Sequence, residues 1–318
     1  MMAGPFEVRA HPPGVTAFAP ATVANLGLGF DVLGLALAGV GDRVTARLVP
    51  GTEVRMARIT GDHGALPMEA PRNTAGIAAI ATLRKAGVQV GVELDLAKGL
   101  PLGSGMGSSA ASAAAAAFAV NLLVGSPLRK ADLILPCVEA EEAVSGRHAD
   151  NVAPALLGGL VLVRSVDPLD VVRLPVPDGL MIAVVTPVFE LATRKARAVL
   201  PKEVPLVSHV SNTANLAALV SAFYSNDLAL LARCLPDAIV TPARAGLIPG
   251  CMDVIDSALE AGALASSISG SGPSMFAFCR SAHSAAAVGA AMVAAFGRAG
   301  LEASAVVSPG DCPGVRRV

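Results

Sequence analysis

A glycine-rich stretch, LPLGSGMGSSAASAAAAA at residues 100–117, has the residue types of a phosphate-binding loop. Gly103, Gly105 and Gly107 can adopt backbone angles that are closed to other residues, so several backbone N–H groups can converge on one anion. Ser108 and Ser109 follow where a helix needs N-caps, and the free amides and positive dipole end of that helix point to the same place. The stretch predicts a phosphate site, although glycine and serine before an alanine-rich helix are also typical of a flexible turn.

Neither of two familiar nucleotide motifs is present in this loop. A Walker A loop ends in Gly-Lys-Ser/Thr, whereas this loop has no lysine within it. Its glycines are spaced GxGxG, so the Rossmann pattern GxGxxG is also missed. A triphosphate bound here would therefore need a metal ion and positive charges from elsewhere in the chain.

One acidic residue is a candidate ligand for that metal. Residues 128–145 show helical spacing, and Glu141 falls within the apolar stripe, whereas Glu139 and Glu142 project to the opposite side. A carboxylate in an apolar stripe is costly unless a cation or several donors meet it. Glu141 is therefore either a metal ligand or the partner of a nearby arginine.

The elements that must position these residues alternate between strands and helices along the chain. The glycine loop is expected between a strand at residues 88–96 and the alanine-rich helix. The other strands are predicted at residues 15–18, 42–48, 181–187 and 303–308. The other helices are predicted at residues 74–86, 208–225, 227–235, 252–261 and 282–299. Residues 193–197 are predicted to form a basic turn. Proline and glycine punctuate residues 166–178, which predicts two domains, 1–168 and 169–318. Strands and helices of both sorts in each half indicate an α+β architecture.

Composition narrows the class of protein. A chain of 318 residues with net charge −1, one tyrosine and no tryptophan offers no basic groove with stacking platforms, so nucleic-acid binding has no support. The longest weakly polar runs are alanine-dominated and too short for a membrane span. Residues 1–14 lack the features of a signal peptide, so we expect a cytoplasmic protein without a membrane partner. The five scattered cysteines are expected to be buried and structural rather than bridged or zinc-bound.

Three glycine-bearing motifs stand in order along the chain: PATVANLGLGFD at 20–31, PLGSGMGSSAAS at 101–112 and SGSGPS at 269–274. Together they resemble the GHMP family of small-molecule kinases. NLGLGFDVLGLAL near the N-terminus, HADNVAPALLGG at 148–159, TRKAR at 193–197 and PARAGLIPG at 242–250 are similar to the branch of that family that phosphorylates L-homoserine. Val23 and Leu28 stand where the first motif usually has serine and proline.

The resemblance implies a fold and a reaction. The first domain would be like the second domain of ribosomal protein S5, the second would be ferredoxin-like, and the active site would lie between them. The reaction would move the γ-phosphoryl group of ATP to the hydroxyl of L-homoserine, giving O-phospho-L-homoserine for threonine biosynthesis. A homodimer is possible, since homodimers are common in the family.

The resemblance also implies a role for each candidate site residue. ATP would be bound by Asn73 and by the glycine loop, that is Pro101, Leu102, Gly103, Ser104, Gly105, Met106, Gly107, Ser108, Ser109, Ala110 and Ala111. Mg²⁺ would be held by Ser109 and Glu141. Arg197 and Arg244 would bind the substrate carboxylate, while Asp31 and Asn25 would accept from its ammonium, although asparagine and aspartate beside glycine often only close turns.

The remaining candidates would act on the reacting groups. Asn151 would orient the substrate hydroxyl, His148 would help to hold its loop, and Thr193 would bond the γ-phosphate. Asp31 is the nearest candidate base, but if it binds the ammonium, the phosphate itself must take the hydroxyl proton. Two alternatives stay open: another GHMP kinase, such as one acting on mevalonate, or a non-catalytic sensor that keeps the fold. If the substrate is homoserine, threonine shares its amino-acid head group and would compete with it for Arg197 and Arg244.

Overall fold

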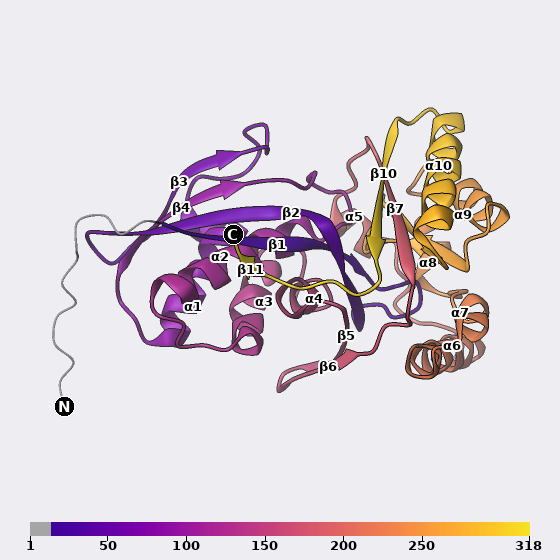
Figure 1. Cartoon of the computed structure of the whole chain (residues 1–318), viewed down its shortest axis with the longest axis horizontal. Helices are drawn as coiled ribbons and strands as arrows, with labels where there is room; N and C mark the ends of the chain where they lie inside the picture. The colour runs from indigo at the N-terminus through magenta and orange to yellow at the C-terminus, as the bar shows by residue number, and fades with distance from the viewer. Residues whose placement is uncertain (1–13) are drawn as a thin grey trace.

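The computed structural model describes residues 14–318 and contains two sheets, one in each half of the chain (Figure 1). The first sheet follows the order β11-β1-β2-β4-β3, with β5 paired to β2 and β6 paired to β5. Its strands are β1 (Val15–Ala24), β2 (Leu33–Val49), β3 (Val54–Thr60), β4 (Gly91–Ala97), β5 (Leu160–Val166), β6 (Leu169–Leu174) and β11 (Arg316–Arg317). The second sheet follows the order β10-β7-β9-β8, with β7 (Met181–Pro187), β8 (Ala265–Ile268), β9 (Met275–Cys279) and β10 (Ala303–Pro309).

The helices of the first half lie together on one side of the first sheet (Figure 1). They are α1 (Thr74–Ala86), α2 (Ser108–Leu123), α3 (Ile134–Glu142) and α4 (Val152–Leu157), with short 3-10 turns at Ala70–Arg72 and Lys130–Leu133. Helix α2 is the central one, because alanine side chains let it pack closely against β1, β2 and α1 while favouring the helical state. The glycine loop is thereby attached to the most buried helix of this half.

The second sheet is covered on both faces. Its helices are α5 (Thr193–Ala198), α6 (Leu206–Ser225), α7 (Leu228–Arg233), α8 (Val240–Ala245), α9 (Cys251–Glu260) and α10 (Ala282–Arg298). Since side chains alternate along a strand, Phe276 and Phe278 belong to the core shared with the first half, whereas Met275 and Ala277 belong to a second core with α9 and α10. The two halves therefore share packed apolar contacts.

The structure confirms the α+β prediction and most of the predicted elements. Helix α1 and strand β7 have the predicted bounds, whereas β1 and β2 are longer than predicted. The single helix predicted over residues 128–145 is wrong: a 3-10 turn comes first and α3 begins only at Ile134. Pro136 explains the late start, because its missing N–H is tolerated only in the first turn of a helix. The predicted basic turn at 193–197 is the short helix α5.

The division at residue 168 stays a prediction. Strand β6 begins directly after it and pairs with β5 in the first sheet. Strand β11, from the far end of the chain, pairs with β1 in the same sheet.

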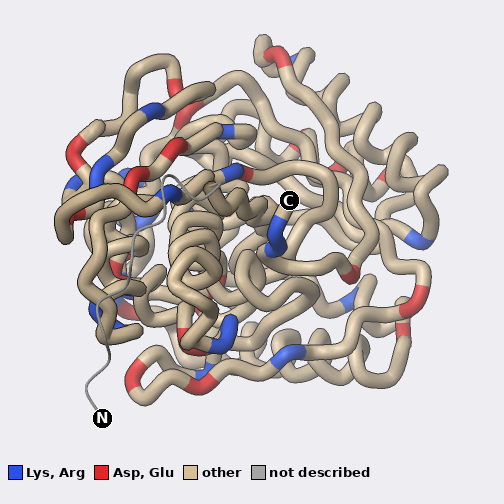
Figure 2. Tube along the Cα trace, turned by 60° about the vertical axis from the view of Figure 1, so that its left-hand side comes forward, with Lys and Arg blue, Asp and Glu red and all other residues tan. Residues whose placement is uncertain are grey.

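Other predictions from composition concern the surface and the cysteines. All five cysteines are free and buried, and burial raises the pKa of Cys234, Cys251, Cys279 and Cys312 to about 11. Among residues 14–318, no helix has the length and apolarity needed to cross a membrane. The prediction about a signal peptide concerns residues 1–14, and residues 1–13 lie outside the part of the chain that the structure describes. Figure 2 shows basic and acidic residues interspersed along the chain, as the small net charge implies.

Candidate active site

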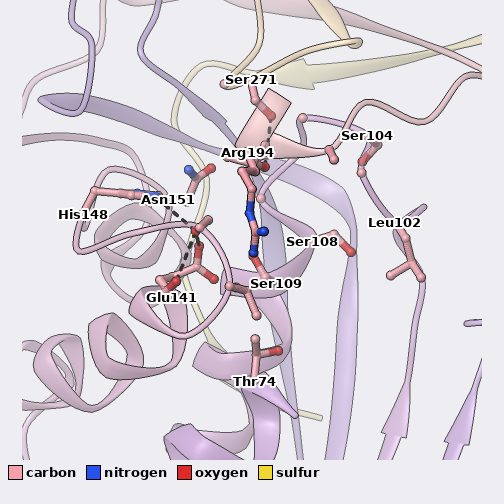
Figure 3. Close-up of a pocket in the computed structure, with 18 of the residues that line it drawn as sticks. Thr74, Leu102, Ser104, Ser108, Ser109, Glu141, His148, Asn151, Arg194 and Ser271 are labelled. Carbon is pink, nitrogen blue, oxygen red and sulfur yellow. Dashed lines mark hydrogen bonds between the residues drawn. The ribbon is translucent and has the colours of Figure 1, made fainter. Parts of the chain in front are cut away.

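A cavity of about 650 Å³ lies where the two halves of the chain meet. The glycine loop, the start of α2, the segment from Glu141 to Asn151 and helix α5 line it, together with Gly270 and Ser271 from the second half. Figure 3 shows Glu141, His148 and Asn151 on one side, Leu102 and Ser104 on the other, and Arg194 between them. This volume is typical of sites for small molecules and cofactors. A second cavity of about 490 Å³ shares Lys98, Leu102 and Glu190 with the first.

The glycine loop has the backbone conformation that its glycines predict. Gly103, Gly105 and Gly107 have φ values of +59°, +78° and +65°. A Cβ at Gly105 would lie 2.6 Å from the carbonyl oxygens of both Ser269 and Gly272. Only glycine fits there, because the loop packs directly against the third motif of the sequence.

The prediction that Ser108 and Ser109 are N-caps is wrong. Gly107 is the N-cap of α2, and the two serines are the first residues of the helix. The reason lies in the backbone, since Gly107 takes the left-handed conformation that ends the loop, and the Ser108 hydroxyl bonds the Leu100 carbonyl oxygen at 3.4 Å instead. With no capping side chain, the first N–H groups of this 16-residue helix stay available to an anion.

The loop residues differ in what they offer the cavity. Leu102, Gly103, Ser104, Gly105, Gly107, Ser108 and Ser109 line it, whereas Pro101 lines the second cavity. The side chains of Met106, Ala110 and Ala111 are buried in the core. If they contribute to the site, they do so through their backbone.

Glu141 is buried in the cavity wall with one oxygen unpaired. The side chain is 2 % exposed, its Oε2 accepts a hydrogen bond from the Ser145 hydroxyl at 3.0 Å, and its Oε1 has no partner. Its neighbours Glu139 and Glu142 face away, as predicted, and pair with Arg84 and Arg147. Glu141 itself forms no ion pair with an arginine among residues 14–318.

A chain of hydrogen bonds continues from Glu141 through the next loop. The Ser145 Oγ lies 3.1 Å from His148 Nε2, and His148 Nδ1 lies 2.7 Å from an Asp150 carboxylate oxygen. Burial of the imidazole disfavours its charged form, but the hydrogen bond to Asp150 and the charges of Asp150, Glu141 and Asp31 outweigh this and raise the pKa of His148. His148 is thus linked to Glu141 through Ser145 and to Asp150 in its own loop, and its predicted role in holding that loop stays a prediction.

Asp31 and Arg197 bind each other in this structure. Two guanidinium nitrogens of Arg197 donate to the two Asp31 oxygens at 3.0 and 2.7 Å. Arg244 is 2 % exposed and donates to the carbonyl oxygens of Ala196 and Gly270 at 3.0 and 2.8 Å. Both guanidinium groups lie over the ring of Phe30, at 5.2 and 5.3 Å from its centroid. Burial and the neighbouring Arg197 lower the pKa of Arg244 to about 10, which leaves it charged at neutral pH.

Four other predicted site residues line the cavity and differ in how many hydrogen bonds their side chains already make: Asn25, Asn73, Asn151 and Thr193. The Asn25 side chain donates to the Gly270 carbonyl and accepts from the Asp31 N–H, which stabilises the turn; its contact with the substrate ammonium stays a prediction. Asn73 caps α1 in the same way, accepting from Ala75 N–H at 3.0 Å. Asn151 accepts from the Thr22 hydroxyl at 2.7 Å, and its amide nitrogen has no hydrogen-bond partner among residues 14–318. The Thr193 hydroxyl lies 3.4 Å from the Ser271 hydroxyl.

Four basic residues that line the cavity were not singled out from the sequence: Arg72, Lys98, Arg194 and Lys195. Lys98 is fully buried beneath the start of α2, where it pairs with Asp42 and donates to the Ser108 carbonyl and the Ser112 hydroxyl at 2.9 Å each. Burial lowers the pKa of Lys98, although Asp42 opposes this. Arg194 extends from α5 toward Ser108 and Ser109 (Figure 3). The TRKAR segment contained the signal for Arg194, but no local pattern marks Lys98, whose partner is 56 residues away.

Both halves of the chain are similar to known proteins. Residues 73–159 match the GHMP kinases N terminal domain, and residues 219–299 match the GHMP kinases C terminal family. The homoserine kinase of Arabidopsis thaliana is 50% identical over 312 residues, which cover 96% of this chain and 84% of that protein. The homoserine kinase of Chlorobaculum tepidum is 44% identical over 95% of this chain and 97% of its own length.

Solved structures extend the comparison to the fold. The crystal structure of homoserine kinase from Cytophaga hutchinsonii superimposes with a TM-score of 0.94 at 44% identity and covers 99% of this chain and 100% of that one. The mevalonate kinase of L. major, at 18% identity and a TM-score of 0.69 over 96% of this chain and 98% of that one, shares the fold. The chain therefore has the two-domain GHMP kinase fold and belongs to the homoserine kinases of the GHMP kinase family.

Proposed function

We propose that this protein transfers the γ-phosphoryl group of ATP to the side-chain hydroxyl of L-homoserine, giving O-phospho-L-homoserine and ADP. The observation that carries the proposal is that one cavity joins an anion-binding glycine loop to an acid and two arginines suited to an amino-acid head group. Threonine biosynthesis is the route in which this product is used.

The nucleotide would lie with its phosphates against the glycine loop. The backbone N–H groups from Gly103 to Ser109 and the uncapped start of α2 offer donors and a positive dipole end to the phosphates. Arg194 adds a cation from the opposite wall, which partly replaces the lysine that the loop lacks. The adenosine end would lie toward Asn73, which lines the same cavity.

The amino-acid head group would exchange partners with the Asp31–Arg197 pair. The substrate ammonium carries the same charge as Arg197 and would bind Asp31, while the substrate carboxylate would bind Arg197 and Arg244 in the planar geometry that guanidinium groups favour. Because both charges of the pair find new partners, neither is left unpaired in the partly buried site.

The oxygen atoms near Glu141 are suitable ligands for a divalent cation. A buried carboxylate oxygen without a partner is the ligand type that Mg²⁺ prefers, and Ser109 lines the same cavity at the start of α2. When bound at Glu141 and Ser109, Mg²⁺ would supply positive charge that neutralises part of the charge on the phosphates.

The protein supplies positioning for the transfer itself. The Asn151 amide would orient the homoserine hydroxyl, and the Thr193 hydroxyl would bond the γ-phosphoryl oxygens. The hydroxyl oxygen forms a bond to the γ-phosphorus while the bond to the β,γ-bridging oxygen breaks and ADP leaves. Since Asp31 is committed to the head group, the hydroxyl proton passes to the transferred phosphoryl group.

An ADP-release assay with Mg²⁺ and ATP tests the proposal when homoserine, mevalonate and galactose are compared as acceptors. We expect release only with homoserine, and competition by threonine at sub-saturating homoserine. Turnover of mevalonate but not homoserine would identify a different GHMP kinase. Homoserine binding by calorimetry without ADP release would identify a sensor instead.

A further inference from the structure

Ser145 stands between the candidate metal ligand and the loop that carries the substrate residues. It follows the end of α3 by three residues, and its N–H still bonds the Glu141 carbonyl oxygen at 2.8 Å. Its hydroxyl oxygen lies 3.0 Å from Glu141 Oε2 and 3.1 Å from His148 Nε2. None of these contacts is required to build α3, which has already ended.

The direction of these hydrogen bonds follows from the available protons. An ionised carboxylate only accepts, so the Ser145 hydroxyl donates to Glu141 Oε2, and its oxygen lies within hydrogen-bond distance of His148 Nε2, at 3.1 Å. The other ring nitrogen of His148 donates to Asp150. The Ser145 hydroxyl also lies 3.3 Å from the Glu141 carbonyl oxygen, four residues back, but its contact with Oε2 is the shorter of the two at 3.0 Å.

This arrangement separates the two oxygens of Glu141. Oε2 is fixed by Ser145, whereas Oε1 is buried and unpaired in the cavity wall. A free carboxylate rotates about its last bond and can present either oxygen. With Oε2 fixed, the oxygen turned away from Ser145 is the one left to meet a cation.

We propose that Ser145 is a positioning residue for the metal–nucleotide site. Its hydroxyl holds Glu141 by Oε2 so that Oε1 is the ligand oxygen, and His148 and Asp150 in turn hold Ser145. This rests on the proposed function, which places a divalent cation at Glu141. Groups that orient a metal ligand through a hydrogen bond change metal affinity by about 10- to 100-fold when they are removed.

The experiment compares Ser145→Ala and Ser145→Thr with a matched control, Ser225→Ala. Ser225 also bonds a carbonyl oxygen four residues back, at the end of α6, far along the chain from the cavity residues. Mn²⁺ binding is measured by electron paramagnetic resonance in the presence of a non-hydrolysable ATP analogue. We expect Ser145→Ala to weaken Mn²⁺ binding about tenfold, Ser145→Thr to restore it because the hydroxyl remains, and Ser225→Ala to bind as the unmodified protein does.

Kinetics provide a second readout that a general loss of structure would not give. Half-saturating Mg²⁺ should rise in Ser145→Ala by the same factor as the Mn²⁺ dissociation constant, with little change in the KM for homoserine. If Ser145→Ala does not fold, Ser145→Cys keeps the size with a weak donor and should show the same loss. Glu141→Gln changes the metal ligand itself, so its loss of Mn²⁺ affinity should be the largest in the series.

Two results would overturn the proposal: Mn²⁺ binding by Ser145→Ala equal to that of Ser225→Ala, or a Ser145→Thr variant as weak as alanine. Failure of the proposed function looks different. The unmodified protein would then bind Mn²⁺ with the analogue but would not turn over homoserine, and the comparison of serine variants would still be decisive.

Discussion

Asp31 and Arg197, 166 residues apart in the sequence, form a two-pronged ion pair across the cavity between the halves of the molecule. Each is about one-third exposed, so the pair is open to solvent and to a ligand. The ring of Phe30, next to Asp31, packs against the Arg197 guanidinium group, 5.2 Å from the ring centroid. The pair thus displays both charges that an amino-acid head group would replace.

Removing the charge of Asp31 tests its role. Asp31→Asn should raise the KM for homoserine about 10- to 100-fold, the range expected for a lost hydrogen bond to a charged group, and should lower kcat less. The KM for ATP should not follow. Steady-state kinetics with both substrates measure this, with Asp95→Asn, which breaks the Arg47 pair on the first sheet, as control. A large fall in kcat at unchanged KM would instead make Asp31 the base.

The contact between Gly105 and the third motif predicts the effect of a methyl group. Gly105→Ala places Cβ against two carbonyl oxygens, whereas Gly125→Ala meets open space at a similarly positive φ of +89°. Gly125→Ala should therefore cost only the conformational strain, about 1–2 kcal/mol. Gly105→Ala should cost more and should also raise the KM for ATP. Urea unfolding and kinetics of the two variants check this, and equal results would show that the contact does not matter.

The buried Lys98–Asp42 pair should be sensitive to loss of one partner. Lys98→Met leaves the Asp42 carboxylate uncompensated and should lower the free energy of unfolding by about 3–5 kcal/mol. Arg47→Met, which breaks an exposed pair with Asp95, should cost about 0–1 kcal/mol. The double variant with Asp42→Asn should recover part of the loss, because the asparagine oxygen can still accept from the Gly99 and Leu100 N–H groups. Equal losses in the two single variants, measured by urea unfolding, would contradict the buried-pair argument.

His148 should make stability depend on pH in a defined direction. Its native pKa is raised above the ordinary value of 6.5, because the hydrogen bond to Asp150 and the charges of Asp150, Glu141 and Asp31 outweigh the effect of burial. Below pH 6.5 the imidazole is protonated in both native and unfolded chains, and its contribution to stability is fully present. As the pH rises through the native pKa, this contribution is lost.

The measurement is the difference in free energy of unfolding between the unmodified protein and His148→Gln from pH 5.5 to 8.5. The difference should be largest at the acid end and should shrink as the pH rises. Subtracting the variant removes the contributions of other titrating groups. A difference that grows with pH would mean that the native state holds a neutral imidazole.

The sequence predicted a feature correctly where one short segment contains all the residues that determine it. The glycine spacing predicted the left-handed turns at 103, 105 and 107, and the apolar stripe of α3 predicted that Glu141 faces inward while Glu139 faces out. The serine N-caps failed because the same glycines allow Gly107 itself to take the cap position. A sequence motif names the residues of a turn, but the backbone decides which of them ends the loop.

Contacts between distant segments could not be predicted in this way. Asp31 and Arg197 were each identified as ligand-binding residues, but nothing local indicates that they bind each other. Lys98 has no motif, since its meaning depends on Asp42 in another strand. The bond from Ser145 to His148 depends on how the loop after α3 turns back. Such pairs form only when the whole fold brings the segments together.

The pairing of β11 with β1 has a consequence for how the protein is made. Arg316 and Arg317 complete the edge of the first sheet, Arg316 covers the ring of Phe18, and Lys130 binds the carbonyl oxygen of Val315. Since β11 follows the whole second sheet in the sequence, a ribosome delivers it only after that sheet has been made. Until then the part of the β1 edge that β11 covers is an open template for wrong partners. The first sheet is therefore completed during translation only after the second one has been synthesised.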